Sequence, residues 1–125
     1  MNGTLRVIVI EDDHLLAETL VDSLTALEYQ VLAQANSVAQ ALQSIETVAC
    51  DFAIVDLYLK GETALPVLDK LCERHIPFLV ATGAYVEDIP ARYLTAPRLS
   101  KPYDMHELQH AIEALPLGAL AQKLA

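Results

Sequence analysis

The sequence has few basic residues, only two cysteines and no long apolar run. Eight Lys and Arg residues stand against seventeen Asp and Glu residues, for a formal net charge of -9. No cluster of basic residues offsets this charge, so we expect no binding to DNA or RNA. No apolar run reaches the roughly 20 residues of a membrane helix, and the N-terminus lacks a secretory pattern. These absences predict a cytoplasmic protein that contacts neither nucleic acid nor membrane.

Familiar cofactor motifs are also missing. Cys50 and Cys72 do not have the spacing of a metal site, and we expect both to be small buried thiols in a reducing compartment. The sequence contains neither a GxGxxG motif nor a P-loop, which argues against a nucleotide-binding domain.

Apolar strands and amphipathic helices alternate along the 125 residues, a length that suits one domain. Strands are expected at residues 5–10, 31–33, 52–55, 78–81 and 97–100. Leucines at helical spacing follow the first strand, and Asp13, Ser37 and Asp104 are placed to cap helices. This alternation predicts an α/β fold, a doubly wound five-stranded parallel sheet with helices on both faces. We expect the domain to span residues 1–118, with a C-terminal tail at residues 119–125.

The segment between the last two strands departs from this pattern. Pro90 and Pro97 flank a short stretch, residues 91–94, that has poor helical length. We therefore expect the fourth helix to be short or irregular.

Polar residues stand where four of the strands end. Glu11, Asp12 and Asp13 follow the first strand, and Asp56 ends the third. In parallel sheets, ligands bind beyond the carboxyl ends of the strands, so these carboxylates should meet at one edge. Because carboxylates held together repel one another, and because oxygen ligands favour hard cations, we expect Mg²⁺ or Mn²⁺ there.

A hydroxyl and an ammonium group complete this edge. Thr82 ends the fourth strand and Lys101 follows the fifth. Asp56 could act as a nucleophile that forms an aspartyl phosphate, while Lys101 and Thr82 would stabilise the oxygens of the phosphoryl group. The pattern predicts phosphoryl chemistry that depends on a divalent cation.

From Leu5 to Leu115 these residues resemble the receiver domains of two-component response regulators. The resemblance implies a flavodoxin-like strand order of 2-1-3-4-5, phosphorylation by a sensor histidine kinase, and no enzyme activity beyond the domain's own phosphorylation and dephosphorylation. It also implies a cis bond between Lys101 and Pro102, although the sequence alone favours trans. The implied site consists of a metal-binding pair, Glu11 and Asp12, the phosphoacceptor Asp56, the backbone carbonyl of Tyr58 as a further metal ligand, and Thr82 and Lys101.

Two departures from the common receiver pattern are informative. Arg98 stands three residues before the Lys, where the family usually has an aromatic switch residue. Residues 80–85 resemble the FATGUY subclass of single-domain receivers, with Val80 in place of Phe, and that resemblance implies a kinase of the HWE type. We hypothesise that Tyr85, or order in residues 83–94, reports phosphorylation instead; the alternative is that Tyr85 packs statically.

Three functions remain to be compared. A phosphorylated single-domain receiver would signal through a downstream protein partner or act as a phosphate sink. A receiver-shaped interaction module that is never phosphorylated is the first alternative. A Mg²⁺-dependent phosphatase of the haloacid-dehalogenase type is less favoured, because the Glu11-Asp12-Asp13 cluster lacks the second Asp at the required spacing.

Overall fold

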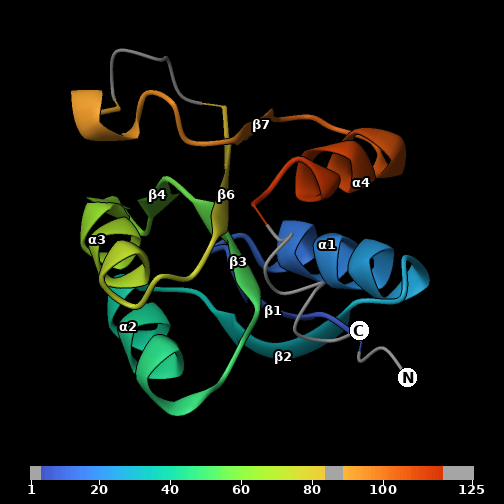
Figure 1. The fold of residues 1–125 in the computed structure, drawn as a ribbon, viewed down its shortest axis with the longest axis horizontal. Coiled ribbons are helices and arrows are strands. Elements are labelled where there is room, and N and C mark those ends of the chain that lie inside the picture. Colours follow the sequence, from blue (N-terminus) through green and yellow to red (C-terminus); the bar gives the residue numbers. More distant parts are fainter. Residues whose placement is uncertain (1–3, 84–88, 117–125) are drawn as a thin grey trace.

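The structure, a computed structural model, describes residues 4–83 and 89–116 (Figure 1). Its main sheet has five parallel strands in the order β2-β1-β3-β6-β7, which is the predicted order of the five expected strands. These strands are β1 (Arg6–Ile10), β2 (Gln30–Ala35), β3 (Phe52–Asp56), β6 (Phe78–Thr82) and β7 (Arg98–Ser100). The helices are α1 (His14–Ala26), α2 (Val38–Thr47), α3 (Leu65–Glu73) and α4 (Met105–Glu113). The predicted doubly wound fold is therefore confirmed.

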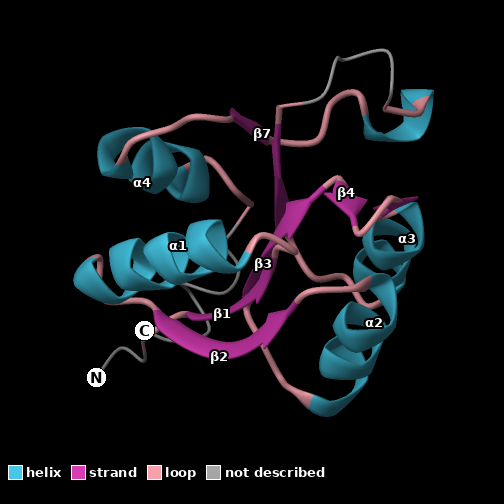
Figure 2. Ribbon diagram, turned by 180° about the vertical axis from the view of Figure 1, so that it is seen from behind, coloured by secondary structure: helices cyan, strands magenta, loops and turns pink. Residues whose placement is uncertain are grey.

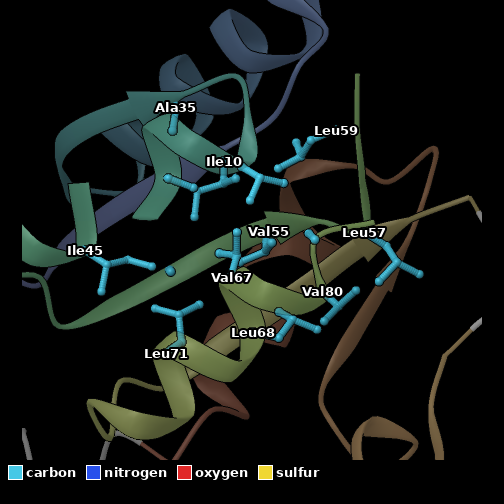
Figure 3. Close-up of a cluster of buried hydrophobic side chains, with 14 of the residues drawn as sticks. Ile10, Ala35, Ile45, Val55, Leu57, Leu59, Val67, Leu68, Leu71 and Val80 are labelled. Carbon is cyan, nitrogen blue, oxygen red and sulfur yellow. The ribbon is translucent and has the colours of Figure 1, made fainter. Parts of the chain in front are cut away.

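The helices cover both faces of the sheet, with α1 and α4 on one side and α2 and α3 on the other (Figures 1 and 2). Successive residues of β1 supply the two cores in turn. Val7 and Val9 pack with α1 and α4, whereas Ile8 and Ile10 pack with α2 and α3 (Figure 3). Burial on both faces explains why the central strands are apolar throughout rather than alternating.

Each of the three predicted caps is present. The side chains of Asp13 and Ser37 accept hydrogen bonds from backbone N–H groups in the first turns of α1 and α2. Asp104 does the same for α4, and Glu107 returns a bond to the Asp104 N–H in a capping box. The caps fix where α1 and α4 begin, directly beside the ends of β1 and β7.

A small antiparallel hairpin, which the sequence did not predict, follows β3. Its strands are β4 (Tyr58–Leu59) and β5 (Glu62–Thr63). Lys60 and Gly61 form its two-residue turn with φ angles of 50° and 82°. Strands of two residues give no periodic signal, so sequence patterns read this segment as a loop.

The connection between β6 and β7 contains no long helix among its described residues. A 3₁₀ turn covers Ala91–Tyr93, in agreement with the expected short or irregular helix. The buried ring of Tyr93 packs edge-on against Phe78 with ring centroids 6.0 Å apart. This contact attaches the turn to the start of β6.

Two further expectations concern the cysteines and the membrane. Cys50 is half-buried, and burial raises the pKa of its thiol to about 11, whereas Cys72 is exposed. The prediction that both are buried is wrong for Cys72, an exposed residue of α3. In the described ranges, no helix is long and apolar enough to cross a membrane. The proposed tail at residues 119–125, and the boundary before it, lie outside the described residues.

Candidate functional site

The carboxyl ends of β1, β3, β6 and β7 meet at one edge of the sheet and bring the predicted site residues together. Ile10 is in register with Val55, and Asp56 is in register with Ala81, so Glu11 and Asp56 follow neighbouring strands. Thr82 is in register with Ser100, which precedes Lys101. The ladder continues one step further, because the Lys101 N–H donates to the Thr82 carbonyl at 3.2 Å. Residues far apart in sequence thus share one small region of the fold.

Three carboxylates form a compact cluster at this edge. One oxygen from each of Glu11, Asp12 and Asp56 lies within 4.8 Å of the others. Glu11 is only 6% exposed, while Asp12 and Asp56 are more accessible to solvent. The donor set contains only oxygen, and its three negative charges favour a small hard cation. The chemistry of these residues therefore fits Mg²⁺ or Mn²⁺.

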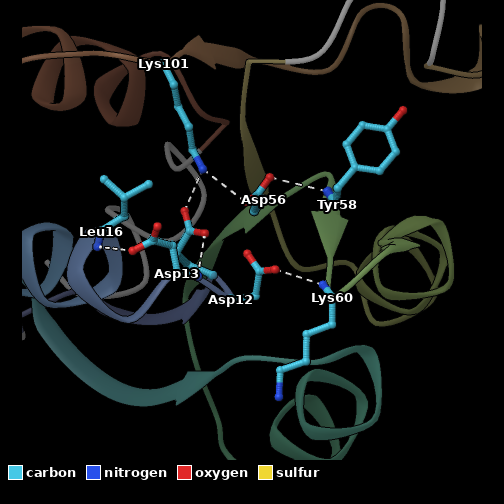
Figure 4. A network of polar contacts seen from close by, with 8 residues as sticks. Asp12, Asp13, Leu16, Asp56, Tyr58, Lys60 and Lys101 are labelled. Carbon is cyan, nitrogen blue, oxygen red and sulfur yellow. Dashed lines mark hydrogen bonds and ion pairs between the residues drawn. The ribbon is translucent and has the colours of Figure 1, made fainter.

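Lys101 extends from the end of β7 and contacts two of the three carboxylates (Figure 4). Its Nζ lies 2.6 Å from Glu11 Oε1 and 3.0 Å from Asp56 Oδ2. Burial alone would lower the pKa of Lys101, but the bonds to Glu11 and Asp56 outweigh it, so the pKa is raised and the ammonium form is favoured. The Lys101–Pro102 bond is cis, as the family resemblance implied.

Burial has the opposite consequence for Glu11. Removal from water raises the pKa of the Glu11 carboxyl, and the negative charge of Asp56 acts in the same direction, while Lys101 opposes it. The Asp13 N–H also donates to Glu11 Oε2 at 3.1 Å. Because burial makes the charged form of Glu11 unfavourable, a nearby cation would stabilise that form. This agrees with a cation site made of these carboxylates.

The main chain of the β4–β5 hairpin holds the other two carboxylates. Tyr58 N–H donates to Asp56 Oδ1 at 3.3 Å, and Lys60 N–H donates to Asp12 Oδ2 at 2.8 Å (Figure 4). The contact from Lys60 was not foreseen in the sequence. Gly61 gave the one available signal, since a glycine in a short polar segment marks a tight turn.

The remaining predicted residues are placed as follows. Thr82 is 7% exposed at the end of β6. The side chain of Arg98 is exposed, and its guanidinium donates to the carbonyl of Leu94 at 3.2 Å. Tyr85, the other suggested switch residue, lies outside the described residues. The structure thus gathers Glu11, Asp12 and Asp56 in one cluster that Lys101 contacts, and it leaves Arg98 on the surface.

Comparisons with known proteins agree on the family. A model of the response regulator receiver domain matches residues 7–113. The solution structure of SdrG from Sphingomonas melonis Fr1 is 34% identical with a TM-score of 0.81, and covers 91% of this chain and 98% of that one. The BeF3-activated conformation of SdrG from Pseudomonas melonis Fr1 is 33% identical with a TM-score of 0.78 over the same shares of the two chains.

A receiver from a different regulator is also similar. The signal receiver domain of a modulated diguanylate cyclase from Desulfovibrio desulfuricans G20 is 27% identical with a TM-score of 0.80, covering 89% of this chain and 92% of that one. No curated protein sequence matches the chain. The family model spans most of the chain, and the 34% identical structure covers 91% of it. The chain therefore belongs to the response regulator receiver domains of two-component signalling.

Proposed function

We propose that this receiver domain accepts a phosphoryl group from a sensor histidine kinase on Asp56, in a reaction that requires Mg²⁺ or Mn²⁺. The observation that carries the proposal is the cluster of Glu11, Asp12 and Asp56 with the Lys101 ammonium 3.0 Å from Asp56. An anionic acceptor, acidic ligands for a cation and a fixed positive charge are the groups that phosphoryl transfer uses.

Four oxygen donors would hold the cation: carboxylates of Glu11, Asp12 and Asp56, and the main-chain carbonyl of Tyr58. The hairpin register supports the role of Tyr58. Leu59 and Glu62 flank the two-residue turn and form the hydrogen-bonded pair, so the main-chain groups of Tyr58 are directed away from β5. Its N–H points to Asp56, and in an extended strand the carbonyl of the same residue faces the same side.

In the proposed reaction, a carboxylate oxygen of Asp56 attacks the phosphorus of a phosphohistidine on the kinase. The new O–P bond forms as the N–P bond breaks, and the electron pair of that bond returns to the imidazole nitrogen. A cation held by Glu11, Asp12 and Asp56 would supply positive charge against the phosphoryl oxygens. Lys101 then exchanges its contact with Asp56 for one with a phosphoryl oxygen, and the hydroxyl of Thr82 donates to another.

The domain is a phosphoacceptor in this proposal and not an enzyme acting on other molecules. The nearest chemical alternative, a phosphatase, needs a second Asp near the nucleophile, and Tyr58 stands two residues after Asp56. The receiver-shaped module that is never phosphorylated remains the alternative function. The compact acidic cluster favours a receiver that is phosphorylated over a module that is not.

We further propose that the chain acts as a single-domain receiver of the FATGUY subclass in the cytoplasm, with an HWE-type kinase as donor. The segment that contains Val80 to Tyr85, the absence of an aromatic residue at Arg98 and the 3₁₀ turn at residues 91–93 support this assignment. The output is a change in residues 82–101, including Tyr85, that alters binding to a downstream protein; a phosphate sink would need no such partner.

The beryllofluoride-activated form of the similar protein SdrG suggests a direct test. Beryllium fluoride with Mg²⁺ should shift the backbone amide signals of Asp56, Thr82 and Lys101 in NMR spectra. The Asp56→Asn variant should show none of these shifts, because it lacks the carboxylate that bonds to beryllium. If beryllium fluoride left the spectrum of the natural protein unchanged, as it should leave that of Asp56→Asn, the interaction module that is never phosphorylated would be favoured.

A further inference from the structure

The hairpin after the phosphoacceptor is anchored to the core at its base. Leu57 and Leu59, which point inward, are 1% and 0% exposed. The Ala64 N–H closes the base by donating to the Leu57 carbonyl at 2.6 Å. A segment of eight residues is thereby fixed against the sheet, even though its turn is exposed to solvent.

The tip of the same hairpin reaches a carboxylate that comes from a different strand. Lys60 N–H donates to Asp12 Oδ2 at 2.8 Å, across 48 residues of sequence (Figure 4). The Lys60 side chain is exposed and takes no part in this contact, which depends on the main chain alone. Positive φ angles at Lys60 and Gly61 define the turn that carries this N–H.

We propose that the Lys60–Gly61 turn is a positioning element for the cation site, which holds Asp12 through the Lys60 N–H so that its other oxygen faces the cation. The inference rests on the proposed function, because it assigns a partner to one of the proposed metal ligands. Without this bond, repulsion from Glu11 and Asp56 favours rotation of the Asp12 side chain away from the cluster.

The same hydrogen bond also has an effect that opposes cation binding. An N–H that donates to Asp12 also withdraws charge from it and occupies one oxygen, which by itself weakens its attraction for a cation. Groups that orient metal ligands nevertheless strengthen binding in general, and their loss typically weakens metal affinity about 10- to 100-fold. We therefore expect the positioning of Asp12 to outweigh the charge that the N–H withdraws from it.

The test compares two proteins with the same side chain at position 60, one of which lacks the N–H; the ester also makes the Leu59 carbonyl a weaker acceptor. One protein carries an Nε-acylated lysine at position 60, and its matched partner carries the α-hydroxy analogue, which turns the Leu59–Lys60 amide into an ester. Mg²⁺ alone is titrated into each, and the dissociation constant is taken from the shifts of backbone amide signals. The same spectra report whether each protein is folded.

We expect the ester to bind Mg²⁺ about 10- to 100-fold more weakly than its amide partner. In the metal-free natural protein, a scalar coupling between the ¹⁵N of Lys60 and the carboxyl ¹³C of Asp12 should report the hydrogen bond directly. Equal or tighter binding by a folded ester, or absence of that coupling, would overturn the inference alone. Failure of the amide partner to bind Mg²⁺ would overturn the proposed function, and the inference with it.

Discussion

Lys101 places an ammonium group 2.6 Å from Glu11 and 3.0 Å from Asp56, and so balances part of the negative charge that the site concentrates. In the proposed reaction it would exchange its contact with Asp56 for one with a phosphoryl oxygen. Under the proposed function, the same residue would stabilise both the resting domain and the phosphorylated one.

Replacing Lys101 with Met tests the first of these roles. We expect the metal-free variant to lose about 1 to 2 kcal/mol of unfolding free energy, because two carboxylates lose a charged partner at a partly exposed site. Mg²⁺ should then stabilise the variant more than the natural protein, since no ammonium competes for the carboxylates. Urea unfolding with and without Mg²⁺ measures both effects, and an equal gain from Mg²⁺ in the two proteins would contradict this role.

Replacing Asp12 with Ala tests the proposed metal ligands. We expect Mg²⁺ to bind at least about 10-fold more weakly, because one of the charged ligands is removed. Labelling of Asp56 by acetyl phosphate should be abolished. Metal titration and intact mass would show this, and labelling retained at the natural level would mean that Asp12 does not hold the cation.

At the scale of elements, the β4–β5 hairpin depends on a glycine with a left-handed backbone. Gly61 has a φ of 82°, and a methyl group added there would meet no atom within 4 Å. Gly61→Ala should therefore cost about 1 kcal/mol from the backbone conformation alone. Gly83→Ala is the matched control, because it also adds a methyl into open space but has no positive φ. Equal unfolding free energies for the two variants would refute the argument.

The 3₁₀ turn at Ala91–Tyr93 is attached to α3 by polar contacts. The Tyr93 hydroxyl donates to Asp69, and the Arg92 guanidinium bonds to the same carboxylate at 3.2 Å while it lies 5.0 Å from the Tyr93 ring centroid. These contacts hold the turn against the side of α3.

Tyr93→Phe should remove the hydroxyl contact and cost up to about 1 kcal/mol at neutral pH. The pKa of Asp69 is lowered, first by the Tyr93 hydroxyl and then by Arg92. Its contribution is therefore present above the ordinary Asp pKa and is lost as the pH falls through the lowered value. Unfolding curves at several pH values should show the two proteins converging in acid; a constant difference would contradict this assignment.

How far each element could be predicted depended on its burial and length. The central strands were recognisable because both of their faces are covered. The edge strand β2 was expected only at residues 31–33 and extends over Gln30–Ala35, because its partly exposed residues weaken the apolar signal. The hairpin was missed because its strands have two residues each, and its contact with Asp12 depends on tertiary packing that no local pattern encodes.

At the scale of the whole molecule, the site was predictable because the topology brings the ends of parallel strands to one edge. The polar residues at those ends were visible in the sequence, and the sheet order then placed them together. The double contact of Lys101 with Glu11 and Asp56 could not be predicted, since it depends on side-chain directions at the ends of three strands. The residue types of the candidate site could thus be read from short segments of sequence, whereas the contacts between their side chains depend on the whole fold.

The most direct test of the central claim is the intact mass of the protein after exposure to acetyl phosphate, with and without Mg²⁺. We predict a gain of one phosphate that requires Mg²⁺, is removed by hydroxylamine and is absent in Asp56→Asn. A protein that binds Mg²⁺ yet gains no phosphate, or an Asp56→Asn variant labelled as fully as the natural protein, would contradict the assignment of Asp56 as the phosphoacceptor.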